Sequence, residues 1–223
     1  PALENHYDPE FRAWDLDYSD MLRAAEFIRE LGEFERSGNM PAFMIMRLPN
    51  DHTIGTRPGK LTPKAMVAQN DLALGMVVEA VTHSRFWKET AIFVIEDDAQ
   101  NGSDHVDAHR SIALVISPYI KRGYVDHTLY DTASMLRTME LILGLGPMSQ
   151  YDAEAFPFIA SFAGKADMTP YTLIQPTVRL DEVNERSAYG SRESLAMDFT
   201  IEDATPEIPL NVIIWKSDRK SVV

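Results

Sequence analysis

Two short stretches of the sequence are rich in carboxylate and imidazole side chains and contain three of its six histidines. The candidate site residues among them are Asp51, His52, Asp97, Asp98, His105 and His109. The chain has no cysteine, which excludes thiolate catalysis and sulfur-ligated metals. Carboxylates and imidazoles together suit divalent zinc, manganese, iron, magnesium or calcium. The two stretches therefore predict a site for a divalent metal whose identity these ligands leave open.

Two of these acids, Asp97 and Asp98, are adjacent and directly follow an apolar run. Neighbouring carboxylates repel each other at neutral pH unless a cation or hydrogen-bond donors compensate their charge. A single Asp or His after a strand is often only a turn or capping residue, so it is the clustering of the whole set that favours a functional site. A calcium-binding loop beginning at Asp97 is excluded, because Ala99 and Ala108 stand where its third and twelfth ligands are required.

Composition and the absence of other motifs exclude several classes of function. The 34 acidic and 21 basic side chains leave a net charge of -13, so nucleic acid is not an expected partner. There is neither a Gly-x-Ser-x-Gly nucleophile elbow nor a phosphate-binding GxxxxGK[ST] loop. No apolar run reaches the ~18 residues of a membrane span. Because the chain begins at Pro1, we expect any targeting signal to lie upstream.

Hydrophobic periodicity and end signals predict the elements that must position these residues. Helical spacing with capping residues predicts helices at 19–37, 62–83 and 130–143. Short unbroken apolar runs predict buried strands at 42–48, 91–95 and 112–116. The first two of these strands end at the two acidic and histidine-rich stretches. Ligands of open α/β sheets bind at the carboxyl ends of strands, so we expect the two stretches to converge.

The order of these elements indicates an α/β fold with helices on both faces of a sheet. We place one domain at 1–146. Beyond it, prolines and scattered acids interrupt the periodicity, so 147–223 is predicted to be an irregular tail. A terminal apolar element near 210–216 is expected to pack on the same domain.

Several motifs give the sequence a family resemblance. They are LPNDHTIGT at 48–56, DLALG at 71–75, FVIEDDAQNGSDHVDAHR at 93–110, SPY at 117–119, MDF at 197–199 and IWKS at 214–217. These strings resemble the bacterial phosphoesterase family that includes phospholipase C-type enzymes and acid phosphatases, within the alkaline phosphatase superfamily. The resemblance covers nearly the whole chain.

The resemblance implies metal-dependent hydrolysis of phosphate esters on an alkaline phosphatase-like α/β/α sandwich. It implies one metal site at Asp97 and Asp98. It implies a second site that takes His52, with Asp51 as its acid, and either His109 or His105 as the later histidine. In some members of the family histidines hold the phosphate instead, which gives His52 and His105 catalytic roles.

One departure from the family pattern concerns the nucleophile. The family's Ser or Thr nucleophile and first metal-binding acid lie in the N-terminal half of the domain, and residues 1–40 offer no clear replacement. The chain is therefore expected to be a partial domain, the C-terminal half, with little activity by itself. The missing half is its expected partner, or else the chain self-associates through exposed sheet edges. Similar proteins often carry an upstream β-propeller and are exported to the periplasm or cell surface.

A second function class stays open. The chain is alternatively a non-catalytic surface module that keeps the same fold and binds a metal or another ligand. The upstream sequence would distinguish the enzyme from the non-catalytic module. A strand followed by Ser or Thr at the start of a helix would favour the enzyme.

Overall fold

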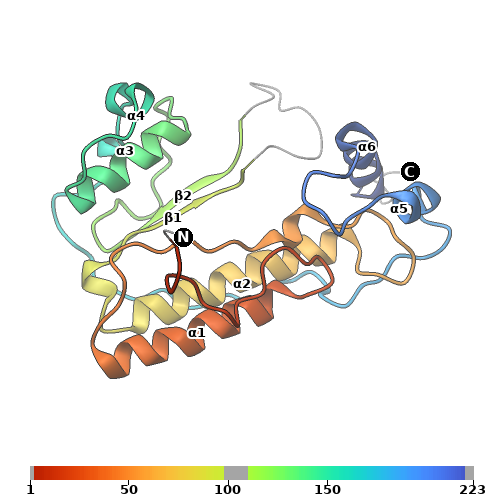
Figure 1. Cartoon of the computed structure of the whole chain (residues 1–223), viewed down its shortest axis with the longest axis horizontal. Helices are drawn as coiled ribbons and strands as arrows, with labels where there is room; N and C mark the ends of the chain where they lie inside the picture. The colour runs from red at the N-terminus through yellow and green to blue at the C-terminus, as the bar shows by residue number, and fades with distance from the viewer. Residues whose placement is uncertain (1–2, 98–109, 219–223) are drawn as a thin grey trace.

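The computed structural model describes residues 3–97 and 110–218 and shows an elongated molecule of helices around a small sheet (Figure 1). Its elements are α1 (Asp20–Ser37), η1 (Pro49–His52), α2 (Pro63–His83), η2 (Trp87–Glu89), β1 (Ile92–Ile95), β2 (Ala113–Ile116), α3 (Thr132–Leu143), α4 (Gln150–Glu154), η3 (Ile159–Ser161), α5 (Ser191–Ala196) and α6 (Glu207–Asp218). The three helices predicted from periodicity are confirmed as α1, α2 and α3.

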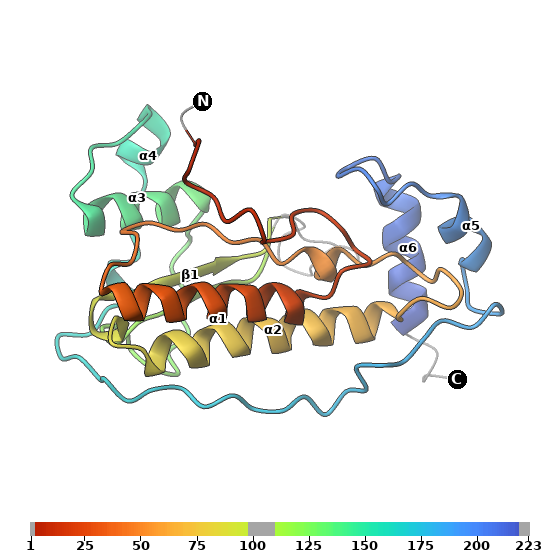
Figure 2. The ribbon, with the colours of Figure 1, turned by 60° about the horizontal axis from the view of Figure 1, so that its bottom comes forward.

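The two long helices α1 and α2 lie side by side and form the base of the molecule (Figure 2). Ser19 caps α1 by accepting a hydrogen bond from the backbone N–H of Met21, and Gly38 ends that helix with a φ of 73°. Thr62 caps α2 in the same way, ahead of a proline in the first turn. The helices share an apolar cluster of Ala24, Phe27, Leu31, Ala73, Val77, Val81 and Trp87.

The sheet consists of β1 and β2, which pair antiparallel with Ile92 opposite Ile116. Both of these isoleucines pack against the cluster between α1 and α2. Phe93, the next residue along β1, lies on the opposite face of the sheet from Ile92. Its ring centroid is 6.5 Å from that of Phe158. The mixture of helices and strands is consistent with the α/β class. The strands predicted at 91–95 and 112–116 are confirmed, but as a two-stranded sheet.

The strand predicted at 42–48 is wrong. Among the described residues, this segment makes no backbone hydrogen bond to another backbone segment. It runs without regular structure past the core, where Met46 and Leu48 pack and Ile45 is 85% exposed. An apolar run indicates burial, but a strand also needs a neighbouring strand to pair with.

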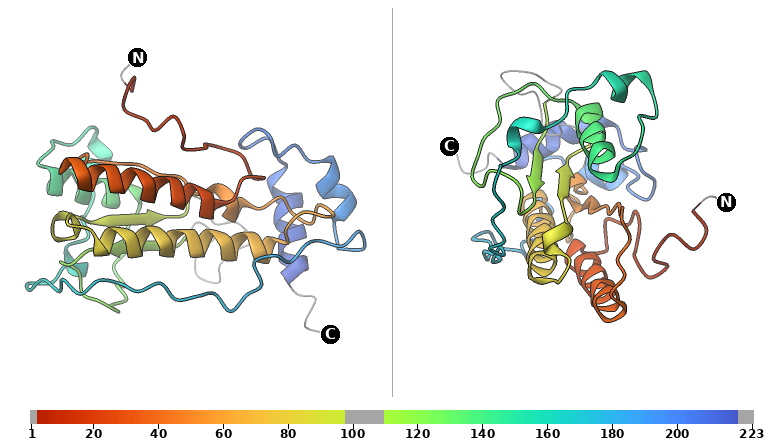
Figure 3. Two further views of the ribbon diagram at one scale, coloured as in Figure 1. Left: turned by 90° about the horizontal axis from the view of Figure 1, so that it is seen from below. Right: turned by 90° about the vertical axis from the view of Figure 1, so that its left-hand side faces the viewer.

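Residues 167–184 cross the molecule without a helix or a strand and run along α2 (Figure 2); near their end Val183 forms an isolated antiparallel bridge with Leu61. Side chains of the helix hold this segment: the Tyr171 N–H donates to Thr82 Oγ1 at 3.1 Å and the Leu173 N–H to Glu79 Oε1 at 2.9 Å. The segment leads to α5 and α6, which lie at the opposite end of the molecule from α3 and α4 (Figure 3). The apolar element predicted near 210–216 is part of α6. The domain boundary at residue 146 stays a prediction.

None of the helices in the described part of the chain combines the length and apolar character needed to cross a membrane.

A buried ion pair lies at the start of α1, where Asp20 and Arg23 both have 0% of their surface exposed. Arg23 Nη1 contacts Asp20 Oδ1 at 3.0 Å. The guanidinium also donates four hydrogen bonds to backbone carbonyls within residues 12–18, at 2.6–2.8 Å. One arginine side chain therefore fixes the course of the N-terminal arm.

Replacing Arg23 with Met tests this arrangement. The substitution leaves the Asp20 carboxylate buried without its cation, which should lower the free energy of unfolding by about 3–5 kcal/mol. Urea unfolding measures the change. Arg36→Met, at an exposed position on the same helix, is the control and should leave stability nearly unchanged. A loss below about 1 kcal/mol for Arg23→Met would contradict this role.

Candidate functional site

The turn η1, which carries Asp51 and His52, is held in place by a network of buried hydrogen bonds. The Asn50 N–H donates to Asp20 Oδ2 at 2.9 Å, and the Asp20 N–H donates to Asn50 Oδ1 at 2.7 Å. Asn70 of α2 donates from Nδ2 to Asp20 Oδ2 at 3.0 Å and to the carbonyl of Leu48 at 2.8 Å. The turn is thereby bonded to both long helices.

Asp51 carries an unfavourably placed negative charge. Burial raises the pKa of its carboxyl above the ordinary value, and the negative charges of Asp20 and Asp97 raise it further. Backbone N–H groups of Asp51 and His52 lower the pKa and offset only part of this effect. A carboxylate in this position gains from a bound proton or a bound cation.

The imidazole of His52 is half-buried between two aromatic side chains. Its ring lies edge to face with Trp14 at a centroid distance of 5.1 Å and with Phe199 at 6.4 Å. Nδ1 lies 3.1 Å from the carbonyl oxygen of Thr53. One ring nitrogen is therefore engaged by the backbone, so Nε2 is the nitrogen through which His52 could bind a ligand.

Asp97 follows β1 and is paired with an arginine from the segment that leads to η1. Arg47 Nη2 lies 3.6 Å from Asp97 Oδ2, and the Asp97 side chain is 83% exposed. The same guanidinium is bonded to Glu202 and lies over the ring of Trp14, 5.2 Å from its centroid. Arg47 therefore connects the end of β1, the N-terminal arm and the segment before α6.

The structure brings part of the predicted site together. Asp51 and His52 are neighbours in η1, and Asp97 is near enough to Asp51 to influence its pKa. Asp98, His105 and His109 lie outside the described residues. Within residues 3–97 and 110–218, no group of three or more His, Asp or Glu side chains could hold a metal. The full set of site residues stays a prediction.

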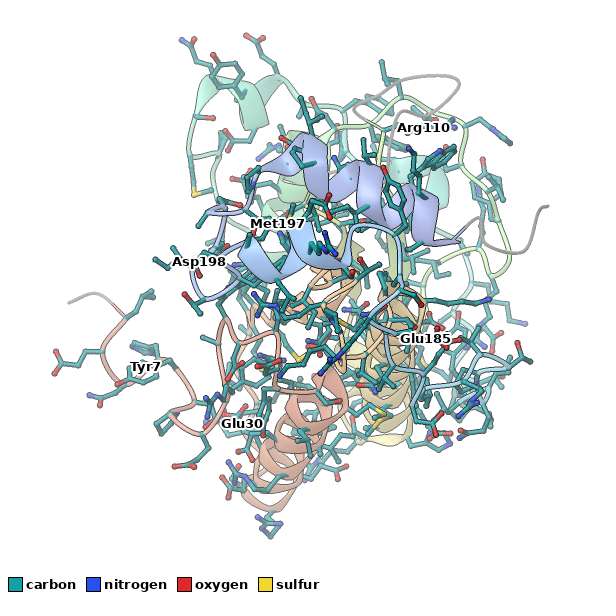
Figure 4. The ribbon with its side chains drawn as sticks, turned by 90° about the vertical axis from the view of Figure 1, so that its right-hand side faces the viewer. Tyr7, Glu30, Arg110, Glu185, Met197 and Asp198 are labelled. Atoms are coloured by element: carbon teal, nitrogen blue, oxygen red, sulfur yellow. The ribbon has the colours of Figure 1, made fainter. Side chains whose placement is uncertain are left out.

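Three residues near the site were not assigned a role from the sequence: Trp14, Arg47 and Phe199. Phe199 follows Met197 and Asp198, which are labelled in Figure 4 at the end of α5. Arg57 fixes this segment by donating from Nη2 to the Met197 carbonyl at 2.9 Å and by lying over the Phe199 ring. The string at 197–199 was part of the resemblance, yet no local pattern links it to a histidine far away in the sequence.

Comparison with known protein families gives a match to part of the chain. Residues 58–146 match the model of the Phosphoesterase family. This match confirms the resemblance to a phosphoesterase family that the motifs indicated. No curated protein and no solved structure matches the chain significantly.

Replacing Asp51 with Asn tests the electrostatics of the site. Since the pKa of Asp51 is raised in the folded state, the folded protein binds this proton more tightly than the unfolded chain does. The ionised carboxylate therefore costs stability at neutral pH, and the cost fades as the pH falls toward the ordinary Asp value of about 3.9. We expect Asp51→Asn to have a higher free energy of unfolding than the wild type near neutral pH. In acid the two free energies should become similar.

Urea unfolding at several pH values measures this difference. Asp71→Asn, at an exposed position on α2, serves as the control and should follow the wild type at every pH. A gap between Asp51→Asn and the wild type that stays constant with pH would show that burial does not penalise the charge of Asp51.

Proposed function

We propose that this chain is part of a metal-dependent phosphoesterase and contributes Asp51, His52, Asp97, Asp98, His105 and His109 to its active site. The observation that carries the proposal is the Phosphoesterase family match at residues 58–146, which supports hydrolysis of phosphate esters. That match contains the stretch that begins at Asp97. Asp51 and His52 lie outside the matched residues, and the electrostatic interaction of Asp51 with Asp97 supports including them.

The donor chemistry of the site fits a divalent cation. Asp51 is a carboxylate whose pKa is raised by burial and by two neighbouring negative charges, so a cation would relieve an existing electrostatic cost. His52 has its Nδ1 engaged by a carbonyl, which is the arrangement of a metal-ligating histidine that binds through its other nitrogen. Asp51 and His52 would hold one metal with His109 or His105, and Asp97 would hold another with Asp98, because the described residues alone provide no group of three ligands. When bound, the metal would polarise the phosphoryl oxygens and activate a hydroxyl nucleophile.

The chain's own residues have three tasks in this proposal. His52 contacts the metal or an oxygen of the phosphate, and His105 is proposed to share that role. The Asp20 network keeps the η1 turn in place, so that Asp51 and His52 do not have to be ordered when the substrate binds. The rings of Trp14 and Phe199 limit the access of water to the imidazole.

We further propose that the complete domain is an α/β/α sandwich in which additional strands, from the upstream half of the same domain, continue the sheet. The segment 42–48 supports this, because within the described part of the chain its backbone bonds to no other backbone segment and its apolar Phe43 and Ile45 are exposed. Exposed Ile95 and Leu114 on the two strands support it as well. Export and an upstream β-propeller belong to the same proposal.

An activity assay tests the proposed function. The chain is assayed with manganese, zinc, calcium or magnesium and an aryl phosphate, alone and together with the upstream half of the domain. We expect little turnover by the chain alone, because the nucleophile lies upstream, and metal-dependent turnover when both halves are present. His52→Ala should then reduce turnover by about 100-fold or more.

The matched control is His83→Ala, which replaces an exposed histidine at the end of α2. It should keep the wild-type rate. Brisk turnover by the chain alone that His52→Ala abolishes would place the nucleophile within residues 1–223. Metal binding without any turnover, with both halves present, would favour the non-catalytic binding module instead.

Self-association of the chain tests the proposal that the upstream half of the domain covers its exposed apolar side chains. The chain by itself exposes apolar side chains on the segment 42–48 and on both strands, so we expect it to associate at micromolar concentrations. Ile45→Lys places a charge on the most exposed of these side chains and should increase the monomer fraction measured by light scattering. A wild-type chain that stays monomeric throughout would contradict the proposed sheet continuation.

A further inference from the structure

Thr53 has a backbone conformation that its residue type strongly disfavours. Its φ is 61° and its ψ is 176°, a region that β-branched side chains rarely adopt. The other non-glycine residues with positive φ in the described part of the chain are Asn5 and Asp203. Both are exposed and of types that tolerate positive φ, whereas Thr53 is 1% exposed. The strain at Thr53 is therefore specific to this position.

Several contacts hold Thr53 in this conformation. Its N–H donates to the carbonyl of Asn50 at 3.1 Å, which closes the η1 turn. Its Oγ1 accepts a hydrogen bond from the Gly55 N–H at 3.2 Å. Ile54, the next residue, packs in the cluster with Met66, Phe199 and the apolar side of α6. The surrounding structure thus imposes a backbone geometry that the residue itself would not choose.

This geometry has a direct effect on the preceding residue. It places the Thr53 carbonyl oxygen 3.1 Å from His52 Nδ1. A carbonyl oxygen only accepts hydrogen bonds, so in the neutral imidazole Nδ1 carries the proton and Nε2 carries the lone pair. The edge-to-face contacts with Trp14 and Phe199 restrict rotation of the ring away from this carbonyl.

We propose that Thr53 is a positioning residue whose strained backbone fixes His52 as the Nδ1–H tautomer. The side-chain hydroxyl and the buried methyl group of Thr53 anchor the backbone, and the carbonyl then selects the nitrogen that stays free. His52 is thereby prepared to use Nε2 as an acceptor or a metal ligand before any ligand arrives. This inference rests on the proposed function only for what Nε2 binds.

His83 provides an internal comparison. Its Nδ1 lies 2.8 Å from the carbonyl of Glu79, one helical turn earlier, so the same tautomer is expected there. That contact depends on regular helix geometry and involves no strained residue. A change at Thr53 should therefore alter the tautomer of His52 and leave that of His83 unchanged.

The test uses long-range ¹H–¹⁵N spectra of the ¹⁵N-histidine-labelled chain at alkaline pH, where imidazole side chains are ordinarily neutral. His52 is assigned from the signals that disappear in His52→Ala. We expect wild-type His52 to show the Nδ1–H pattern. Thr53→Ala removes the hydroxyl and the methyl group that anchor the backbone but keeps the Cβ that disfavours positive φ. The backbone should therefore relax, and His52 should shift toward the Nε2–H form that free histidine favours.

Two control variants accompany Thr53→Ala. Thr53→Ser keeps the hydroxyl that accepts from Gly55 and should retain the Nδ1–H pattern. Asn5→Gly changes an exposed positive-φ residue in the N-terminal arm and should leave His52 unchanged. Circular dichroism verifies that each variant is folded. An Nε2–H pattern in the wild type, or an unchanged Nδ1–H pattern in folded Thr53→Ala, overturns the proposal. If Thr53→Ala fails to fold, the wild-type and Thr53→Ser patterns decide.

A second readout separates this inference from the proposed function. Titration with Zn²⁺ alone, followed by calorimetry, should show about 10-fold weaker binding for Thr53→Ala than for Thr53→Ser. If neither the wild type nor any variant binds Zn²⁺, the metal role of His52 fails while the tautomer spectra still decide the role of Thr53. If zinc binds equally well to all variants although the tautomer changes, the tautomer of His52 does not affect metal binding. The claim that Thr53 prepares Nε2 for a ligand is then rejected.

Discussion

The carboxylate of Asp20 is the group on which the organisation of the candidate site depends. It is fully buried and bonds to Arg23 of its own helix, to the backbone of Asn50 and to Asn70 of α2. Burial raises its pKa, and each of these partners lowers it again by stabilising the charged form. Partners from α1, η1 and α2 thus stabilise the negative charge of Asp20. The η1 turn is fixed in position because the N–H of its Asn50 is one of these partners.

The site is acidic, and its charges are only partly compensated. Asp51 lies within the influence of Asp20 and Asp97, while Arg47 balances the charge of Asp97 from outside the turn. In a chain with a net charge of -13, an anionic substrate would be repelled unless cations gathered at the site. The electrostatics of the described residues therefore support metal-assisted chemistry over a mechanism that relies on the protein's basic side chains alone.

Helices were predicted well from the sequence, whereas the pairing of strands was predicted poorly. The helices follow from capping residues such as Ser19 and Thr62 and from apolar spacing, which are local signals. The prediction of a strand at 42–48 failed because a strand requires a neighbouring strand to pair with, which no local sequence pattern reveals. In the candidate site, Asp51, His52 and Asp97 were predicted from their types and motifs, and their roles stay predictions. Trp14 and Phe199 were not, because only tertiary folding brings them to His52.

The aromatic enclosure of His52 has a consequence for the order of folding. Trp14 donates from Nε1 to the carbonyl of Phe199 at 3.2 Å, a contact between residues 185 positions apart. The pairing of α1 with α2 closes a much shorter loop and so loses less chain entropy. The helical base is therefore expected to form early, and the enclosure only once synthesis has passed Phe199. The histidine thus becomes shielded as one of the last events of folding, which couples the maturation of the site to the arrival of the C-terminal segment.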